Sequence, residues 1–104
     1  MEFDKMQKVL VGLSEADAKV WLAAHCHPFE YMDKGMLIRG KDHVAQEILQ
    51  RCSGRYRALL KSGDGSFKYD DQTRISYSTD VIIFVAEGDR KVFHVDFELI
   101  GDGP

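Results

Sequence analysis

The sequence predicts one α+β domain over residues 1–104, with N-terminal helices packed on a curved antiparallel β-sheet. Two patterns predict this fold. Apolar residues recur at helical spacing in the first quarter of the chain, and they alternate with polar residues in the last third. The length suits one hydrophobic core and is too short for two. With 44% hydrophobic and 30% charged residues, the chain has the composition of an ordinary globular domain.

Two helices are predicted before Pro28. Apolar residues at helical spacing over 3–13 indicate a first helix that ends near Gly12. Ser14, with Asp17 three residues later, forms a capping-box pattern that opens a second helix. We expect this helix to end by residue 27, because a proline does not continue a helix easily. Its predicted apolar stripe is Leu13, Val20, Trp21 and Ala24.

The next part of the chain predicts two short extended segments and a third helix. Residues 29–32 and 36–38 are the extended segments, separated by a turn at Gly35. The third helix begins between residues 40 and 42. Its predicted apolar face is Val44, Ile48, Leu49 and Cys52.

Residues 54–61 allow two interpretations. They either continue the third helix or form a strand, with Tyr56, Ala58 and Leu60 as its alternate positions. Residues 62–66 predict a loop, because glycine, serine and aspartate cluster there. Residues 72–78 then alternate as a further strand ahead of a terminal hairpin.

The terminal hairpin carries the clearest strand patterns. Residues 81–86 are apolar on both faces, which is typical of a covered central strand, and residues 87–90 supply the turn. Residues 91–100 alternate, with His94, Asp96 and Glu98 on one face and Phe93, Val95, Phe97 and Leu99 on the other. The expected cross-strand pairs are Asp96 with Val81 and His94 with Ile83.

Two aspartates are the candidate catalytic residues. In the expected register, Asp96 lies beside apolar surface, where the neutral form of a carboxyl group is favoured and proton transfer becomes possible. Asp33 follows a strand candidate and precedes a glycine turn. Each also has an ordinary structural interpretation, Asp33 as a turn residue and Asp96 as a solvent-facing position of its strand.

Composition argues against several classes of function. Fourteen basic and seventeen acidic residues give a net charge of −3, which does not favour nucleic acid as a partner. No phosphate-binding GxxxxGK[ST] or GxGxxG motif and no GxSxG nucleophile motif occurs. We see no signal peptide and no apolar run of about 18 residues, so a cytoplasmic location without membrane association is expected. Cys26 and Cys52 are expected to be reduced thiols.

No metal or cofactor is predicted. His25 and His27 are two residues apart, and on a helix such positions point about 200° apart, so they could share an ion only if the segment were extended. His43 and His94 show no ligand spacing. A ribonuclease-type toxin using His25 or His94 with the arginines of residues 51–57 is chemically possible. The acidic net charge opposes it, because such enzymes need a basic groove.

Residues 29–45, FEYMDKGMLIRGKDHVA, carry a family resemblance. They are similar to the strand–Asp–turn–Gly–helix signature of the cone-shaped α+β superfamily that includes nuclear transport factor 2 (NTF2), SnoaL-type polyketide cyclases and ketosteroid isomerases. Gly40 and Val44 stand at the helix-start positions, and residues 92–103 resemble the penultimate strand and its glycine-containing turn. The resemblance implies an NTF2-like cone, in which a curved sheet surrounds a ligand pocket.

The same resemblance implies roles for the two aspartates. Asp33 stands where the isomerases keep their general base, and Asp96 where they keep a protonated aspartate that donates a hydrogen bond. Two features depart from the family. Residues 1–30 contain no tyrosine to act as the second oxyanion donor, and the chain ends at Pro104, where the last strand should begin. A second subunit could close that open edge, so a homodimer is an expectation.

Two functions follow as hypotheses. The first is a domain that binds a small apolar ligand, with isomerase- or cyclase-type proton transfer: Asp33 removes a proton beside a carbonyl, and neutral Asp96 donates to the enolate oxygen. The alternative is a non-catalytic protein-binding module, such as a small acidic inhibitor, immunity or assembly protein. The sequence leaves open whether the protein is an enzyme. The expected ligand-binding residues are Trp21, Tyr31, Tyr77, Phe84 and His94, and the expected core residues are Trp21, Ile48, Ile82, Phe84, Phe93, Val95 and Phe97.

Overall fold

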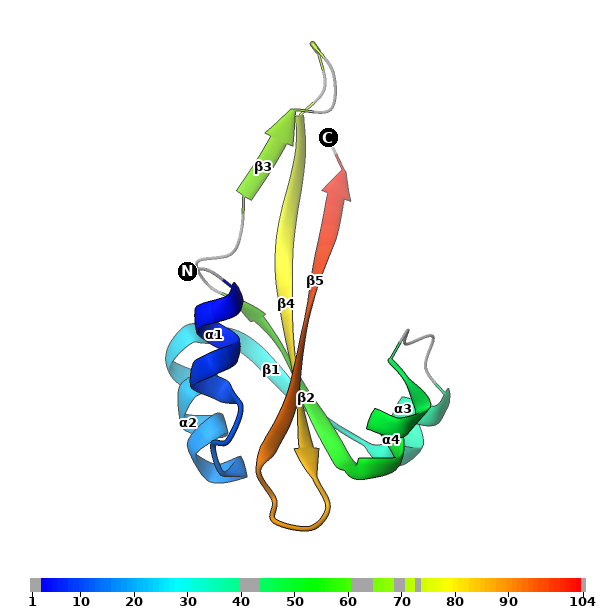
Figure 1. Ribbon diagram of the computed structural model, residues 1–104. Helices are drawn as coiled ribbons and strands as arrows, with labels where there is room; N and C mark the ends of the chain where they lie inside the picture. The colour runs from blue at the N-terminus through cyan, green and yellow to red at the C-terminus, as the bar shows by residue number, and fades with distance from the viewer. Residues whose placement is uncertain (1–2, 40–43, 61–64, 69–70, 73, 104) are drawn as a thin grey trace.

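The computed structural model describes residues 3–39, 44–60, 65–68, 71–72 and 74–103, without the side chains of 37–39, 65–68, 74–77 and 99–103 (Figure 1). Helices and strands follow one another in an α+β order. The helices are α1 (Phe3–Leu10), α2 (Glu15–His25), α3 (Lys34–Arg39) and α4 (Gln46–Arg51). The strands are β1 (Cys26–Asp33), β2 (Cys52–Leu60), β3 (Gly65–Lys68), β4 (Arg74–Ala86) and β5 (Val92–Gly103).

In the described part of the chain, five strands form one antiparallel sheet with β4 at its centre. β5 pairs with β4 along one edge, while β2 and β3 pair with successive lengths of the other edge. β1 pairs with β2 and is therefore the outermost strand on that side. Figure 1 shows the far end of β4, with β3 and β5 beside it, projecting beyond the helices.

α1 and α2 cover one face of the sheet (Figure 1). Met6, Leu10, Ala18 and Leu22 of these helices are fully buried. Burial of one large aliphatic side chain contributes about 1.5–3 kcal/mol, so this cluster holds the two helices on the sheet. The predicted packing of N-terminal helices on an antiparallel sheet is confirmed. The sheet side of the cluster is Cys26, Tyr56, Ala58, Leu60, Val81, Ile83, Val85, Val92 and Val95.

The linker between α1 and α2 ties both helices to the start of β5. The amide of Gly12 donates to the carbonyl of Val92 at 2.8 Å, and the amide of Val92 donates to the carbonyl of Leu13 at 2.8 Å. Gly12 has φ +99°, a conformation that glycine adopts without strain. Ser14 then caps α2, because its hydroxyl accepts from the amide of Asp17 at 3.2 Å. The predicted start of the second helix is confirmed.

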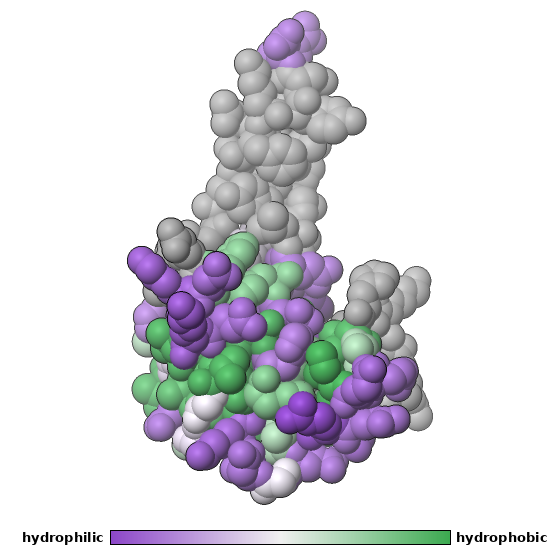
Figure 2. Space-filling view, in the orientation of Figure 1, coloured by the Kyte–Doolittle hydropathy of each residue, from purple (hydrophilic) through white to green (hydrophobic). Residues whose placement is uncertain are grey.

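The predicted stripe of the second helix is wrong in part. Val20 is 70% exposed, whereas Ala18 and Leu22 are buried, with Leu13 and Trp21 packed at the margin of the cluster. The bonds between the linker and β5 set the rotation of α2 about its axis, and that rotation selects the buried face. Apolar side chains consequently remain on the surface of α1 and α2, where Figure 2 shows hydrophobic colouring on that side of the molecule.

α3 and α4 cover part of the opposite face (Figure 1). There Leu49 of α4 packs with Cys52, Ile82 and Phe84 of the sheet. Phe84 is fully buried although it lies on the face away from α1 and α2. The prediction that the strand of residues 81–86 is covered on both faces is confirmed. Val44, Ile48 and Phe93 pack at the margin of this second cluster.

The expected extended segment at residues 36–38 is wrong, because these residues lie in α3. The carboxylate of Asp33 accepts a hydrogen bond from the amide of Met36 at 3.0 Å, which satisfies a free amide in the first turn of the helix. An aspartate directly before a helix is a common capping residue, so Asp33 initiates α3. The predicted start of the following helix, at 40–42, lies outside the described residues; α4 begins at Gln46.

The structure also defines the strand boundaries that the sequence left open or placed wrongly. Residues 54–60 belong to β2, because Tyr56, Ala58 and Leu60 face the core beneath α1 and α2. Cys52, predicted in the third helix, is the first residue of this strand. The strand predicted at 72–78 and the first hairpin strand are one continuous element, β4. Residues 65 and 66, predicted as loop, begin β3, and the rest of that loop is outside the described residues.

The predicted hairpin register is correct only beside the turn. The amide of Ala86 donates to the carbonyl of Lys91, and Val85 pairs with Val92, as a four-residue loop requires. A bulge then shifts the pairing by one residue, so Asp96 lies opposite Ile82 rather than Val81. His94 likewise lies opposite Phe84 rather than Ile83. Such a bulge places one extra residue in β5 and locally disrupts the ladder.

The bulge also changes the face on which one aromatic ring lies. Phe93 was predicted on the face of Val95, but it packs with the cluster beneath α4. The guanidinium of Arg51 lies 4.6 Å from the centre of the Phe93 ring, a cation–π contact. Val95 and Phe97 keep the predicted face.

Candidate binding groove and sheet edge

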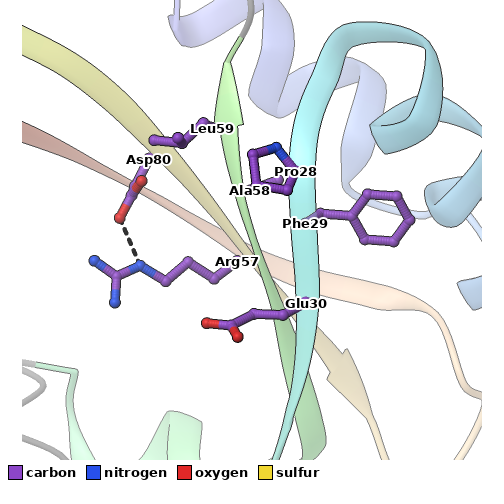
Figure 3. A pocket seen from close by; sticks show the side chains of 7 residues that line it. All are labelled: Pro28, Phe29, Glu30, Arg57, Ala58, Leu59 and Asp80. Atoms are coloured by element: carbon purple, nitrogen blue, oxygen red, sulfur yellow. Dashed lines mark hydrogen bonds and ion pairs between the residues drawn. The ribbon is translucent and has the colours of Figure 1, made fainter.

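An open groove of about 470 Å³ lies where β1, β2 and β4 run side by side (Figure 3). Glu30 and Arg57 project to the same side of the sheet, and Asp80 reaches towards Arg57. Phe29 points the other way and contributes to the groove from β1. The groove is on the face that α3 and α4 cover only in part. Its lining residues are Pro28, Phe29, Glu30, Arg57, Ala58, Leu59 and Asp80.

An ion pair forms the polar end of the groove. Nε of Arg57 donates to a carboxylate oxygen of Asp80 at 2.5 Å, and the Asp80 side chain is only 4% exposed. Glu98 approaches the same guanidinium at 4.0 Å. The hydrogen bond to Asp80 raises the pKa of Arg57 above its ordinary value, against the opposing effect of burial, and Glu98 and Glu30 raise it further. Arg57 therefore holds its charge at every relevant pH.

The sheet register explains why these four charged residues meet. Glu30 lies directly opposite Arg57 on the neighbouring strand, and Glu98 lies opposite Asp80. Leu59 lies directly opposite Asp80 on β2, so the row that contains Asp80 and Glu98 continues with an apolar side chain. Directly opposed residues in antiparallel strands have Cβ atoms roughly 5 Å apart. Three carboxylates around one guanidinium give this part of the face a formal charge of −2.

We predict that the Arg57–Asp80 pair stabilises the fold more than a surface pair does. Arg57→Met keeps the aliphatic stem but leaves the buried carboxylate without its partner. We expect the unfolding free energy to fall by about 1–2 kcal/mol, less than for a fully buried pair because water screens the partly exposed guanidinium. A double-mutant cycle with Asp80→Asn, followed by urea unfolding, measures the coupling.

The exposed pair of Lys34 and Glu87, at 3.1 Å, is the matched control. Its side chains are 39% and 55% exposed, so its coupling should stay below about 0.5 kcal/mol. Equal coupling in the two cycles would contradict the structural role assigned to Arg57.

The outer edge of the sheet runs beside the groove. β1 has neighbours on one side only among the described residues, and positions 27–31 are all exposed. Phe29 and Tyr31 are 37% and 46% exposed, with their rings against Tyr56 at centroid distances of 6.4 and 5.1 Å. Tyr31 also passes close over Gly54, where a Cβ atom would lie 2.3 Å from the Tyr31 hydroxyl. The strand thus presents aromatic rings on one face and the groove on the other.

Asp33 and Asp96 are not brought together. Asp33 is in line with Val85 of β4 through Gly54, whereas Asp96 pairs with Ile82. Three strand spacings and three residues separate them, roughly 14 Å across the sheet and roughly 10 Å along it. The carboxylate of Asp33 caps α3, and Asp96 is 43% exposed with Nε2 of His94 at 3.4 Å.

The four predicted ligand-binding residues whose side chains are described do not converge either, and none of these four lines the groove. Trp21 stacks on His25 at 4.3 Å at the margin of the cluster between α2 and the sheet, and Tyr31 lies on the same face of the sheet. Phe84 is buried on the opposite face with His94 at 5.4 Å. Tyr77 belongs to β4, but its side chain is outside the described residues.

Sequence reasoning missed the residues that form the groove. From the sequence, Arg57 is considered only among the arginines of residues 51–57, as part of a possible ribonuclease site, and Glu30 and Asp80 are given no role. The alternation of Arg55, Arg57 and Leu59 with Tyr56, Ala58 and Leu60 was the available signal, because it places the arginines on the face opposite the core. This alternation identifies the charged face only if residues 54–60 form a strand, and the sequence left that choice open.

Other chemistry has little support in the described residues. No group of three histidine, cysteine, aspartate or glutamate side chains there is arranged to hold a metal ion. Cys26 and Cys52 are buried and form no disulfide, and burial raises the pKa of Cys52. None of the helices in that part of the chain has the length and apolar character needed to cross a membrane.

Comparison with known proteins gives no relative. No protein-family model matches the chain, and no curated protein or solved structure is significantly similar to it.

Proposed function

We propose that this protein is a non-catalytic protein-binding module that binds an extended segment of a partner chain along the edge of β1. The observation that carries the proposal is the exposed strand itself, with Phe29 and Tyr31 on one face and the groove on the other. An added strand gains main-chain hydrogen bonds from such an edge, and pockets beside it select alternate side chains.

The limited protection of this edge supports this function. Exposed edges are normally blocked by proline, by charged side chains, lysine above all, or by a bulge. In β1 the proline and the bulge are confined to the beginning, where Pro28 lies within a bulge between Cys26 and Phe29. From Phe29 to Asp33 the strand pairs regularly with β2 and contains neither proline nor lysine, and its charged residues are Glu30 and Asp33. Five regular residues present roughly 17 Å of strand to a partner.

Selection of peptides tests the proposal on the full chain. Peptides enriched from a displayed random library should bind with affinities that depend on their own backbone amides. We expect N-methylation of the alternate amides that face β1 to weaken binding by at least about tenfold, since each lost hydrogen bond is worth about 1.4 kcal/mol. Isothermal titration calorimetry with synthetic peptides measures this effect.

Two protein variants locate the binding surface. Tyr31→Ala should weaken the selected peptides, whereas Val20→Ala, on the exposed side of α2, should not. Failure to enrich any peptide, or binding that tolerates N-methylation throughout, would overturn the proposal.

A small apolar ligand is the second candidate, favoured by the volume of the groove. Small-molecule sites usually have volumes of about 300–1,000 Å³, and Pro28 and Leu59 give this groove apolar walls. This candidate uses the groove rather than Asp33 and Asp96, because one small ligand cannot span the distance between them. Fragment screening by NMR should then shift the methyl resonances of Leu59 but not those of Val20.

The NTF2-like relationship stays a prediction, as do the homodimer and the absence of nucleic-acid binding. The order of elements, two helices followed by a strand, helices and further antiparallel strands, agrees with that superfamily. The groove proposed here lies on the face away from α1 and α2, so the binding function does not depend on the relationship.

A further inference from the structure

We propose that the groove beside β1 takes a lysine or arginine side chain of the bound segment. This inference rests on the proposed function, since the basic side chain belongs to the strand added to β1. Its basis is the arrangement of charge in the groove, together with the geometry that an added strand must adopt.

The groove carries more negative than positive charge. Arg57 already donates from Nε to Asp80, and Glu98 lies 4.0 Å from the same guanidinium. Glu30, exposed on β1, forms no ion pair with another described residue. A basic group that enters from the β1 side meets the carboxylate of Glu30 first, and behind it the charge of Arg57 is already offset by Asp80 and Glu98. Charge complementarity therefore favours a basic group.

The geometry brings such a group to the right place. Successive side chains of a strand point to opposite faces, so every second residue of the added segment faces the groove. The residue opposite Glu30 would have its Cβ atom roughly 5 Å from that of Glu30. From this position the head group of a lysine or arginine reaches the carboxylate of Glu30, one strand spacing away, whereas Asp80 on β4 and Glu98 on β5 lie three and four strand spacings from the added strand.

The apolar lining of the groove favours binding of a lysine or arginine side chain over binding of a small cation. Pro28 and Leu59 border the path between Glu30 and Asp80. Lysine and arginine can lay their methylene stems along apolar surface while the charged head stays hydrated. The site therefore combines an apolar surface for the stem with the carboxylate of Glu30 for the head.

The test uses the full-length protein and the peptides enriched against it. We expect lysine or arginine at alternate positions of these peptides, and replacement of that residue by norleucine should weaken binding about tenfold. Glu30→Gln should weaken the basic peptides about three- to tenfold and leave their norleucine versions unchanged. Because Glu30 is exposed, this substitution should not disturb folding, which circular dichroism verifies.

Glu47→Gln, on the exposed side of α4, is the charge-matched control and should change neither affinity. Enriched peptides without basic residues, or with acidic residues whose binding requires Arg57, would overturn this inference and leave the edge-strand function intact. Failure to enrich any peptide would overturn both.

Discussion

Phe84→Ala is expected to lower the unfolding free energy by about 3–5 kcal/mol, the usual cost of removing a fully buried phenylalanine. Phe84 is 0% exposed and packs with Leu49, Cys52 and Ile82 between the sheet and α4. Its loss leaves a cavity at the centre of the sheet, where β4 is paired on both edges and cannot move to fill it. Urea unfolding, followed by the fluorescence of Trp21, measures the change.

Phe29→Ala is the matched control, because Phe29 is 37% exposed on the outermost strand. We expect a smaller loss there, about 1–2 kcal/mol, since more than a third of the side chain is already in water. Similar losses in the two variants would contradict the assignment of Phe84 to a second core beneath α3 and α4.

The second large effect is expected at Leu22. Leu22 is 0% exposed in the cluster that joins α2 to the sheet, so Leu22→Ala should lower the unfolding free energy by about 2–5 kcal/mol. The upper part of this range applies if α2 cannot shift, and the hydrogen bonds between its preceding linker and β5 limit such a shift. The same unfolding measurement applies.

Val20→Ala tests the rotation of α2 at a position two residues away. Val20 is 70% exposed, so its truncation should change the unfolding free energy by no more than about 0.5 kcal/mol. The sequence-based stripe, which includes Val20 and omits Leu22, makes the opposite prediction. A larger loss at Val20 than at Leu22 would show that the helix faces the sheet differently.

Local patterns predicted the elements that local forces determine. The hydroxyl of Ser14 needs only the amide of Asp17 to cap α2, and both residues are visible in the sequence. The apolar run of residues 81–86 likewise predicts a strand covered on both faces, and both apolar clusters include it. Alternation predicted β5 correctly, apart from the face of Phe93.

Features that depend on distant contacts were not predictable in this way. The bulge at Phe93 has no marker in the sequence, because the ring moves to α4 only when Arg51 and the second cluster are there to receive it. Residues 54–60 carry both helical and strand patterns, and burial of Tyr56 beneath α2 decides between them. α3 was missed although Asp33 is a good capping residue, because Gly35 favours a turn in the sequence alone.

The groove was missed for the same physical reason. Glu30, Arg57 and Asp80 are separated by 27 and 23 positions in the chain and meet only because β1, β2 and β4 are neighbours. Strand order and the covering of each face are global properties of the fold. The sequence could therefore predict the residue types on each strand without showing which of them share a surface.

The central claim is that the edge of β1 binds an extended chain through its backbone. Glu30→Pro and Tyr31→Pro test it, because neighbouring residues of an edge strand direct their amides alternately into the sheet and outwards. Each is compared by calorimetry with the alanine variant at the same position, using the selected peptides. We expect one proline variant to lose the β1–β2 pairing and unfold more readily, and the other to keep its stability but bind at least about tenfold more weakly, the equivalent of one lost hydrogen bond. A proline variant that keeps both its stability and the full affinity of its alanine counterpart would contradict the claim.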